Sequence, residues 1–239
     1  MCGRLIAGNM TQAQMLAIIE GFVYPTRSVV IDVDAPPAET GYNIKPTQQV
    51  NIVFPQGGAV MASTARWWLV PSWFKGAAED WKPTTFNAKI ETAFEKPSFR
   101  QAWSSGRCLI PATGYYEWSG PKTKRMPNHV RLSQNQPVML LAGLHSQLSD
   151  GRRTCTVLTR PALPDIEALH PRMPVILTAD EATAWLDKTA SDDTIRDSFG
   201  THWDGRFLVD PVAKFGLKDD GPELIEPLEA SKFDLRPPG

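Results

Sequence analysis

The sequence predicts an α+β fold: a single domain with a β-rich, barrel-like core and peripheral helices. Short runs rich in β-branched and aromatic residues recur along most of the chain, separated by glycine and proline turns. Helical periodicity is confined to a few segments between these runs. No long linker, low-complexity segment or internal repeat divides residues 1–239, so we expect one domain over the whole length.

The first strand is expected at residues 5–7, a short apolar run. The clearest hairpin joins residues 49–54 to residues 60–68 around the Gly57-Gly58 turn. Further strands are predicted by short apolar runs at residues 107–111, 114–118, 129–132, 138–144, 154–159 and 175–177. Strands therefore dominate, which favours a barrel-like centre.

Helices are expected where apolar side chains recur at helical spacing. Thr11 is a candidate cap for a helix over residues 12–20, and a second helix is expected over residues 92–103, interrupted by Pro97. Shorter helices are predicted at residues 165–169, at residues 180–187 with Asp180 as cap, and from Asp192. Loops are predicted at residues 24–40, 71–86 and 121–127 and in the C-terminal tail.

Composition excludes several classes of protein. The chain has no apolar run of the ~18–20 residues that a membrane span needs. Its N-terminus lacks the pattern of a signal peptide, so we expect a cytoplasmic protein without a membrane partner. Three distant cysteines argue against a disulfide framework and a zinc site. We expect no metal or cofactor, and a monomer because nothing in the sequence suggests an obligate dimer.

The charge distribution is uneven although the net charge is only −1. Residues 60–131 contain eleven Lys and Arg against five Asp and Glu, whereas residues 150–239 contain eleven against seventeen. A basic segment that is also rich in aromatic residues is compatible with a localised phosphate-binding surface. The alternative is that these charges are scattered over a solvated surface.

The residue with the most distinctive chemistry is Cys2. A small residue after Met1 normally leads to removal of the methionine, which would make Cys2 the N-terminal residue. An ordinary α-amine titrates near ~8 and an ordinary thiol near ~8.5, so both react at neutral pH. Such a 1,2-aminothiol condenses with an aldehyde to an imine and then closes a thiazolidine. The alternative is an accidental cysteine at a frayed terminus.

Three polar residues are candidates for acid–base or positioning roles. Asn87 can orient a substrate or an α-amine through its amide, or it can be a turn residue that opens the following helix. Glu117 lies between aromatic residues and is either a buried acid that exchanges protons or a side chain that points into water. His170 is followed by Pro171 and Pro174, which restrict the backbone around it, and it suits proton transfer, although a structural histidine in a rigid turn is the alternative.

Two adjacent aromatic residues, Trp73 and Phe74, follow a proline in a loop near Lys75 and Lys82. Exposed aromatic rings beside cations suit base stacking, whereas packing within the loop is the alternative. Arg172, close to His170, is suited to a phosphate. The sequence contains no glycine-rich phosphate loop, no His-Glu-x-x-His and no Gly-x-Ser-x-Gly motif.

Eight motifs that occur in order along nearly the whole chain carry a resemblance to a known family. They are Met1-Cys2-Gly3-Arg4, Tyr42-Asn43-Ile44-Lys45-Pro46, Trp67-x-Leu69-Val70-Pro71-Ser72-Trp73, Phe86-Asn87-Ala88-Lys89-Ile90-Glu91-Thr92, Arg107-Cys108-Leu109-Ile110-Pro111, Gly114-Tyr115-Tyr116-Glu117-Trp118, His170-x-Arg172-Met173-Pro174 and Gly221-Pro222-Glu223-Leu224-Ile225. Together they resemble the SOS-response-associated peptidase family of abasic-site-processing proteins. The combination is highly specific, although no single motif is.

The resemblance implies a function. Cys2 would attack the ring-opened aldehyde of an abasic site in single-stranded DNA, including at junctions with duplex, and would form a thiazolidine that shields the lesion. The same Schiff base would support an abasic-site lyase activity. Asn87 would position the N-terminal cysteine and the sugar, Glu117 would act as acid and base, and His170 would transfer a proton near the sugar.

The resemblance also implies a set of DNA contacts. Arg4, Lys89 and Arg172 would contact phosphates. Trp73 and Phe74 would form an aromatic wedge at the junction, and Trp118 and Thr159 would line the site. Two residues depart from the family pattern. Lys89 stands where the family most often has Arg, which replaces a forked phosphate contact with a point charge, and Trp68 stands where Gly is usual.

Two other function classes remain open on the sequence. An N-terminal cysteine with Asn87, Glu117 and His170 could act as a thiol peptidase, with removal of Met1 as its minimal activity. A non-catalytic module that binds single-stranded DNA through Trp73, Phe74 and the basic loop is the third class. Covalent DNA capture needs the amine and the thiol together, a peptidase needs mainly an activated thiolate, and a binding module needs neither.

Overall fold

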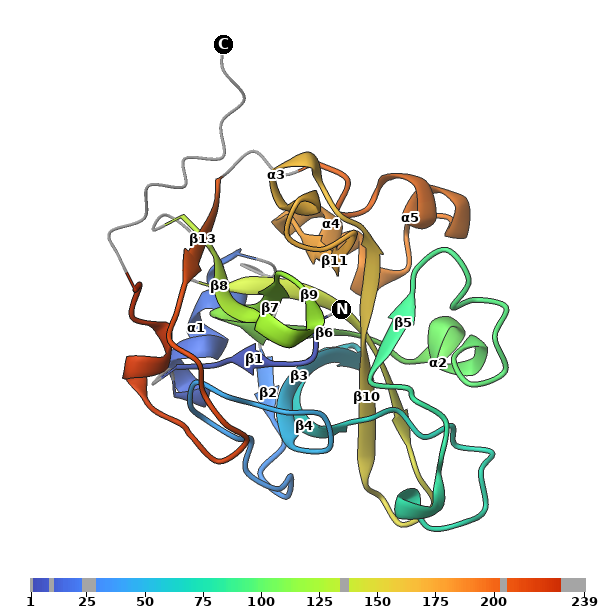
Figure 1. Cartoon of the computed structure of the whole chain (residues 1–239). Helices are drawn as coiled ribbons and strands as arrows, with labels where there is room; N and C mark the ends of the chain where they lie inside the picture. The colour runs from blue at the N-terminus through green and yellow to red at the C-terminus, as the bar shows by residue number, and fades with distance from the viewer. Residues whose placement is uncertain (1, 9–10, 23–28, 134–137, 203–205, 229–239) are drawn as a thin grey trace.

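The computed structural model describes residues 2–8, 11–22, 29–133, 138–202 and 206–228. Two β-sheets form the centre of one α+β domain, and short helices lie at its periphery (Figure 1). The larger sheet curls into a partly closed ring, so the predicted β-rich, barrel-like core is confirmed. Met1 and the predicted tail at residues 229–239 lie outside the described residues.

The larger sheet is organised around five strands that pair in a ring: β3 (Gln49–Gln56), β4 (Ala59–Trp67), β10 (Arg153–Pro161), β9 (Met139–Gln147) and β6 (Arg107–Ala112). Strands β3 and β4 form the predicted hairpin at Gly57 and Gly58, both of which have positive φ. The ring closes because β10 pairs antiparallel with β9 and parallel with β4. Its narrowest join is the single pair of Val53 with Leu109.

Four short strands extend this sheet at its edges. They are β2 (Val29–Ile31), β5 (Asn87–Lys89), β11 (Arg172–Pro174) and β12 (Ile176–Leu177). Strands β5 and β11 both pair with the C-terminal half of β10, one parallel and one antiparallel. This end of β10 therefore brings together segments that are about 80 residues apart in the sequence.

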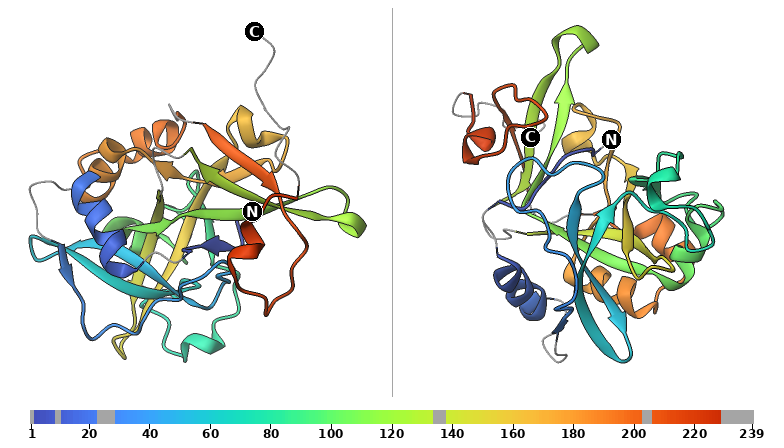
Figure 2. Two further views of the ribbon diagram at one scale, coloured as in Figure 1. Left: turned by 90° about the vertical axis from the view of Figure 1, so that its left-hand side faces the viewer. Right: turned by 90° about the horizontal axis from the view of Figure 1, so that it is seen from below.

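The smaller sheet has the order β1 (Leu5–Ile6), β7 (Gly114–Ser119), β8 (Met126–Leu132) and β13 (Phe207–Pro211), with every neighbouring pair antiparallel. The β7–β8 hairpin extends beyond the rest of this sheet in both views of Figure 2. The N-terminal strand β1 lies at one edge of the sheet, against β7. Residue 2 is thereby brought close to the seam between the two sheets.

The described helices are α1 (Gln12–Phe22), α2 (Arg100–Ser105), α3 (Pro164–Glu167), α4 (Ala179–Asp187) and α5 (Asp192–Ser198), with short 3₁₀ turns η1 (Ala78–Asp80), η2 (Lys122–Lys124) and η3 (Pro222–Ile225). All but α3 cover one face of the ring strands, where apolar side chains such as Ile19, Trp103 and Trp185 pack with one set of alternating strand residues. The other set, including Ile52 and Ile110, packs with Cys2 and Tyr115. Strand alternation thus divides the core into two layers.

Several elements differ from the sequence-based prediction. The helix expected at residues 92–103 begins only at Arg100, because Pro97 cannot supply the backbone donor that an earlier start would need. Helix α4 is capped by Thr178 in a capping box with Glu181, and the predicted cap Asp180 lies inside the first turn. The sequence did not predict the short strands β2, β5, β11 and β13, since tertiary pairing rather than local pattern defines them.

Two properties of the described residues bear on function. None of their helices combines the length and the apolar character needed to cross a membrane. They also contain no group of three or more His, Cys, Asp or Glu side chains arranged to hold a metal ion.

Burial of His145 should make the stability of the protein pH-dependent. Its ring packs on Phe54 with centroids 4.3 Å apart, and burial, aided by Arg153 and Lys188, lowers its pKa to about 4. An unfolded histidine titrates near ~6.5, so the unfolded state binds more protons between these values and stability falls as the pH drops through them. His129 shares this behaviour because burial lowers its pKa to about 4 as well.

We therefore expect the free energy of unfolding to fall by roughly 2 kcal/mol per buried histidine between about pH 6.5 and about pH 5. His145→Leu should remove its share of that slope, whereas His202→Leu, at an exposed position, should not. Urea denaturation at several pH values measures the slope. An identical slope in wild type and His145→Leu would contradict the expectation.

Candidate active site

Cys2 is completely buried, at the seam between the two sheets. The backbone that leads from it is held on both sides: Leu5 exchanges two 2.9 Å hydrogen bonds with Ile44, and the Tyr116 amide donates to the Arg4 carbonyl at 3.1 Å. The Cys2 thiol lies 4.0 Å from that same Arg4 carbonyl. A frayed terminus would make none of these contacts, so the interpretation of Cys2 as a frayed end is wrong.

Asn87 anchors residue 2 directly. Its Nδ2 donates a 2.6 Å hydrogen bond to the carbonyl oxygen of Cys2. Asn87 is the first residue of β5 and pairs with Val157 of β10, so it is not the turn residue of a following helix. The ladder fixes the direction of this side chain, and the side chain in turn fixes the backbone of Cys2.

Glu117 is buried in β7, with 5% of its surface exposed, and does not point into bulk water. Its Oε1 accepts a 3.2 Å hydrogen bond from the Trp118 amide. Burial, reinforced by the charge of Glu117, raises the pKa of the Cys2 thiol well above its ordinary value. The thiol is therefore neutral at pH 7, next to a side chain that can accept or donate a proton.

Tyr115 is a site residue that the sequence did not single out. It lies two residues before Glu117 on the same face of β7 and opposite Leu5 of β1. The pKa of its phenol is raised by burial and then by Cys2 and Glu117. Its hydroxyl has no hydrogen-bond partner among the described residues. Strand alternation, which puts Tyr115 and Glu117 on one face, was the signal in the sequence.

His170 lies between α3 and β11, and the backbone holds its ring. Nδ1 is 3.0 Å from both the amide nitrogen and the carbonyl oxygen of Arg172. If the amide donates to Nδ1, the neutral ring carries its proton on Nε2, directed away from this turn. The Arg172 backbone thus fixes the orientation of the His170 ring through Nδ1.

Arg172 is engaged within the protein. Its guanidinium forms a two-pronged ion pair with Glu91, at 2.9 Å for each contact, and donates to the Thr159 carbonyl at 2.6 Å. Burial alone would raise the pKa of Glu91, but the hydrogen bonds and charge of Arg172 lower it overall. Thr159 itself is 1% exposed, and its hydroxyl donates to the Ala88 carbonyl at 3.3 Å.

Strand β10 organises this half of the site. Thr159 pairs with Lys89 of β5 on one side and with Pro174 of β11 on the other. Lys89 is exposed at the end of β5, two residues from Asn87. The ladder therefore places the Asn87 and Lys89 pair and the His170 and Arg172 pair on either side of one strand end.

Trp73 and Phe74 form an exposed aromatic ridge supported by Trp81, which the sequence did not identify. Trp73 is 48% exposed, and its indole packs edge-on against Trp81 with centroids 5.6 Å apart. Phe74 is half-buried and makes a similar contact at 5.1 Å. The loop thus combines features of both alternatives: the aromatic rings pack against one another within the loop, and Trp73 is still exposed to solvent.

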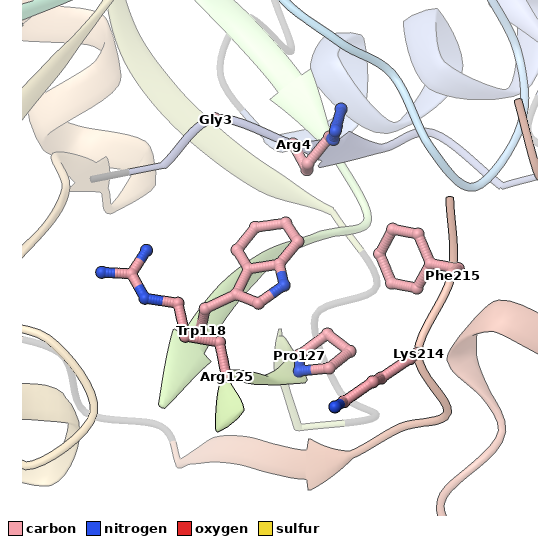
Figure 3. Close-up of a pocket in the computed structure, with 7 residues that line it drawn as sticks. All are labelled: Gly3, Arg4, Trp118, Arg125, Pro127, Lys214 and Phe215. Carbon is pink, nitrogen blue, oxygen red and sulfur yellow. The ribbon is translucent and has the colours of Figure 1, made fainter. Parts of the chain in front are cut away.

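Arg4 and Trp118 line an open pocket of about 390 Å³ next to Gly3 (Figure 3). Its other lining residues are Arg125, Pro127, Lys214 and Phe215. The pocket begins one residue from Cys2, on the side of β7 that carries Trp118 rather than Glu117. Cationic and aromatic side chains thus line the same pocket close to Cys2.

Residues 1–214 match the model of one protein family, described as SOS response associated peptidase (SRAP). The match covers most of the chain. The protein belongs to the SRAP family. The family resemblance carried by the eight sequence motifs is thus confirmed.

Several curated proteins are similar to this chain. The abasic site processing protein YoqW of Bacillus subtilis is 34% identical over 195 residues, which cover 77% of this chain and 85% of YoqW. YedK of Escherichia coli, also named an abasic site processing protein, is 25% identical, covering 95% of this chain and all of YedK. A crystal structure of a protein from Bacteroides thetaiotaomicron has the same fold, with a TM-score of 0.74 and 20% identity, over 95% of this chain and 99% of that one.

The bond from Asn87 to Cys2 should be what holds the N-terminus in this SRAP domain. Asn87→Ala leaves the buried Cys2 carbonyl without its donor, so we expect a loss of about 1–2 kcal/mol in unfolding free energy. We also expect faster amide exchange in residues 4–6, measured by hydrogen–deuterium exchange. Asn51→Ala is a control, because the Asn51 side chain has no hydrogen bond to another described residue. Unchanged exchange in Asn87→Ala would mean that the strand pairing alone anchors residue 2.

Proposed function

We propose that this protein captures abasic sites in single-stranded DNA covalently, through the amine and thiol of Cys2. The proposal requires removal of Met1, which gives Cys2 a free α-amine. It is supported by family membership and by relatives named abasic site processing proteins. The observation that carries it is local: a fully buried Cys2 held by its backbone next to an acid.

The proposed chemistry balances without a cofactor. The open form of an abasic deoxyribose presents an aldehyde at C1′. The Cys2 amine adds to this carbon and one water leaves, which gives an imine. The thiol then adds to the imine carbon, and its proton passes to the imine nitrogen, so that a five-membered thiazolidine closes. In the lyase reaction a base would remove a C2′ proton from the same imine, a C2′–C3′ double bond would form, and the 3′ phosphate would leave by β-elimination.

Each buried polar residue has a task in this scheme. Asn87 holds the Cys2 carbonyl at 2.6 Å, which fixes the direction of both reacting groups. Glu117 moves protons as the sugar ring opens to the aldehyde and as water leaves during imine formation. His170 is the second proton carrier, through the ring nitrogen that the Arg172 backbone does not hold.

The protonation state of the thiol favours DNA capture over general peptidase activity. A cysteine peptidase needs a thiolate, which requires a cation or a helix N-terminus that lowers the thiol pKa. Burial and Glu117 act in the opposite direction on Cys2. In thiazolidine formation the amine reacts first, so a neutral thiol is acceptable until the imine is in place. Removal of Met1 is the only peptidase activity we assign.

DNA is proposed to reach Cys2 across a surface with charged and aromatic parts. Lys89 and Arg4 offer charge for phosphates on the two sides of the site. Arg172 would contact a phosphate if one of its two hydrogen bonds to Glu91 were replaced by a hydrogen bond to the phosphate. The ridge of Trp73 and Phe74 would stack against the last base pair at a junction. Trp118 and the buried Thr159 are the remaining residues proposed to line the DNA-binding site.

The central test separates the amine from the thiol. Wild type mixed with a single strand that carries one abasic site should give a denaturation-resistant adduct, whereas Cys2→Ala should give none. Insertion of one alanine between Met1 and Cys2 keeps the thiol but moves the α-amine to another residue. That variant should give an adduct only after borohydride reduction, because it can form the imine but cannot close the ring.

Denaturing gels and intact-mass measurement distinguish these outcomes, with an undamaged strand of the same sequence as control. Cleavage of a peptide by wild type without any DNA adduct would support the peptidase function instead. Binding of the strand without adduct or cleavage would support the non-catalytic module.

Glu117→Gln separates proton transfer from thiol ionisation. Loss of an acid–base group should slow single-turnover adduct formation by about 100-fold. Loss of its negative charge should also lower the pKa of the Cys2 thiol, which by itself would speed a reaction limited by thiolate. Rates measured by quenched-flow at saturating DNA decide between the two effects. A rate that rises would contradict the acid–base role, and an unchanged Kd for a strand with a tetrahydrofuran abasic analogue controls for binding.

A further inference from the structure

The phenol of Tyr115 is a buried polar group that no step of the proposed reaction uses. Tyr115 is 1% exposed and packs with Cys2 and Leu5 in the apolar layer between the two sheets. Its hydroxyl is enclosed and has no hydrogen-bond partner among the described residues. The phenol of the next residue, Tyr116, donates to the Leu224 carbonyl at 3.2 Å. A buried hydroxyl without a partner is unfavourable, so a ligand atom that accepts its hydrogen bond would be stabilised.

The backbone fixes where this hydroxyl lies. Tyr115 pairs with Leu5 of β1 on one side and with Val130 of β8 on the other, so its strand lies inside the sheet and not at an edge. Glu117 follows on the same face of β7, roughly 7 Å further along the strand. The phenol therefore projects from a rigid strand on the side of the sheet that carries Cys2 and Glu117.

The electrostatics place the hydroxyl close to both of these side chains. Burial, and then the charges of Cys2 and Glu117, raise the pKa of the Tyr115 phenol well above its ordinary value. Charge interactions weaken with distance, so a phenol that responds to both groups lies near both. An ordinary phenol titrates near ~10. The Tyr115 hydroxyl consequently keeps its proton at neutral pH and is a neutral donor beside the reactive cysteine.

A second buried atom decides which reacting group this donor would meet. The Oδ1 atom of Asn87 is also enclosed without a partner among the described residues, whereas Nδ2 of the same amide donates to the Cys2 carbonyl at 2.6 Å. An amide oxygen can only accept a hydrogen bond, so its complement is the N–H of a Cys2 α-amine. The Tyr115 hydroxyl can donate, and its complement is the oxygen of the aldehyde that this amine attacks.

We infer that Tyr115 is a further catalytic residue of the proposed capture reaction, whose hydroxyl donates a hydrogen bond to the C1′ oxygen of the open sugar as the Cys2 amine attacks C1′. This inference rests on the proposed function. The lone pair of the amine forms the C–N bond, and the electron pair of the C=O double bond moves onto the oxygen. Negative charge develops there, where a preorganised donor in a buried site stabilises it most.

The remaining proton transfers do not involve the phenol proton. Both protons of the neutral amine pass to the C1′ oxygen with the help of Glu117, and this oxygen leaves as water when the C=N bond forms. Tyr115 keeps its own proton throughout. It therefore acts on imine formation and has no part in the later attack of the thiol on the imine.

The test removes the hydroxyl alone. Tyr115→Phe keeps the ring and should slow adduct formation by about 100-fold, the usual effect of losing one such donor. The rate is measured in single turnover at saturating concentrations of a strand with one authentic abasic site. Kd for a strand with a tetrahydrofuran, which has no C1′ oxygen, should stay at the wild-type value. A wild-type rate in Tyr115→Phe would overturn the inference.

Tyr116→Phe is the matched control, since it makes the same change at the adjacent residue on the opposite face of β7. It keeps the backbone amide, so its adduct rate should equal that of wild type. It should lower the unfolding temperature, because the bond to the Leu224 carbonyl is lost. Tyr115→Phe should unfold at the same or a higher temperature than wild type. A lower temperature would show that the hydroxyl already has a partner in the protein, and would overturn the inference.

Cyanoborohydride separates a catalytic role from simple packing against Cys2. When present from the start, it reduces part of the imine before the ring closes, and the reduced product contains one more H₂ than the thiazolidine. Mass analysis of the N-terminal peptide gives the ratio of the two products. Tyr115→Phe should slow both products alike and keep the wild-type ratio. A changed ratio would mean that the thiol has moved relative to the imine, and the catalytic role would be rejected in favour of packing.

The outcomes keep this inference distinct from the proposed function. If wild type forms the adduct and Tyr115→Phe forms it at the same rate, the role of Tyr115 is overturned and covalent capture stands. If wild type forms no adduct, covalent capture is overturned, and the role of Tyr115 falls with it.

Discussion

The site depends on one constraint: the buried backbone of residues 2–6 must find hydrogen-bond partners away from water. Ile44, Tyr116 and Asn87 supply them, and the Thr113 amide donates to Ile6 at 2.8 Å. A chain terminus is normally solvated and mobile. Here the pairing of β1 with β7 converts it into an edge strand, so Cys2 occupies a fixed position between two sheets.

Residues from both sheets contribute to the candidate site around that position. The end of β10 brings Asn87 and the His170 turn together from opposite neighbours in the larger sheet. The smaller sheet supplies Glu117 and Tyr115 from β7. The geometry of the candidate site thus depends on how the two sheets pack against each other, and the shared apolar layer that contains Cys2, Ile52 and Ile110 fixes that packing.

The strong local patterns were sufficient to predict much of this from sequence. Short apolar runs predict every strand of the ring. The order of the motifs identifies the family and selects Cys2, Asn87 and Glu117 as candidate site residues. Contacts between distant residues could not be predicted. The two-pronged bond of Arg172 to Glu91 and the support of Phe74 by Trp81 depend on tertiary packing, and short edge strands such as β11 exist only through their partners. No local periodicity encodes these contacts.

The side chains of two adjacent residues of β7 lie on opposite faces of the sheet: Glu117 is on the face of the buried Cys2, and Trp118 is on the face of the open pocket. Side chains alternate along a strand, so insertion of a single residue between Gly114 and Glu117 would exchange these two faces. The same insertion at the tip, in residues 120–125, would leave both faces intact. We therefore expect the hairpin to tolerate insertions in its turn but not in β7, which makes the tip the position for grafting a tag or a second binding module.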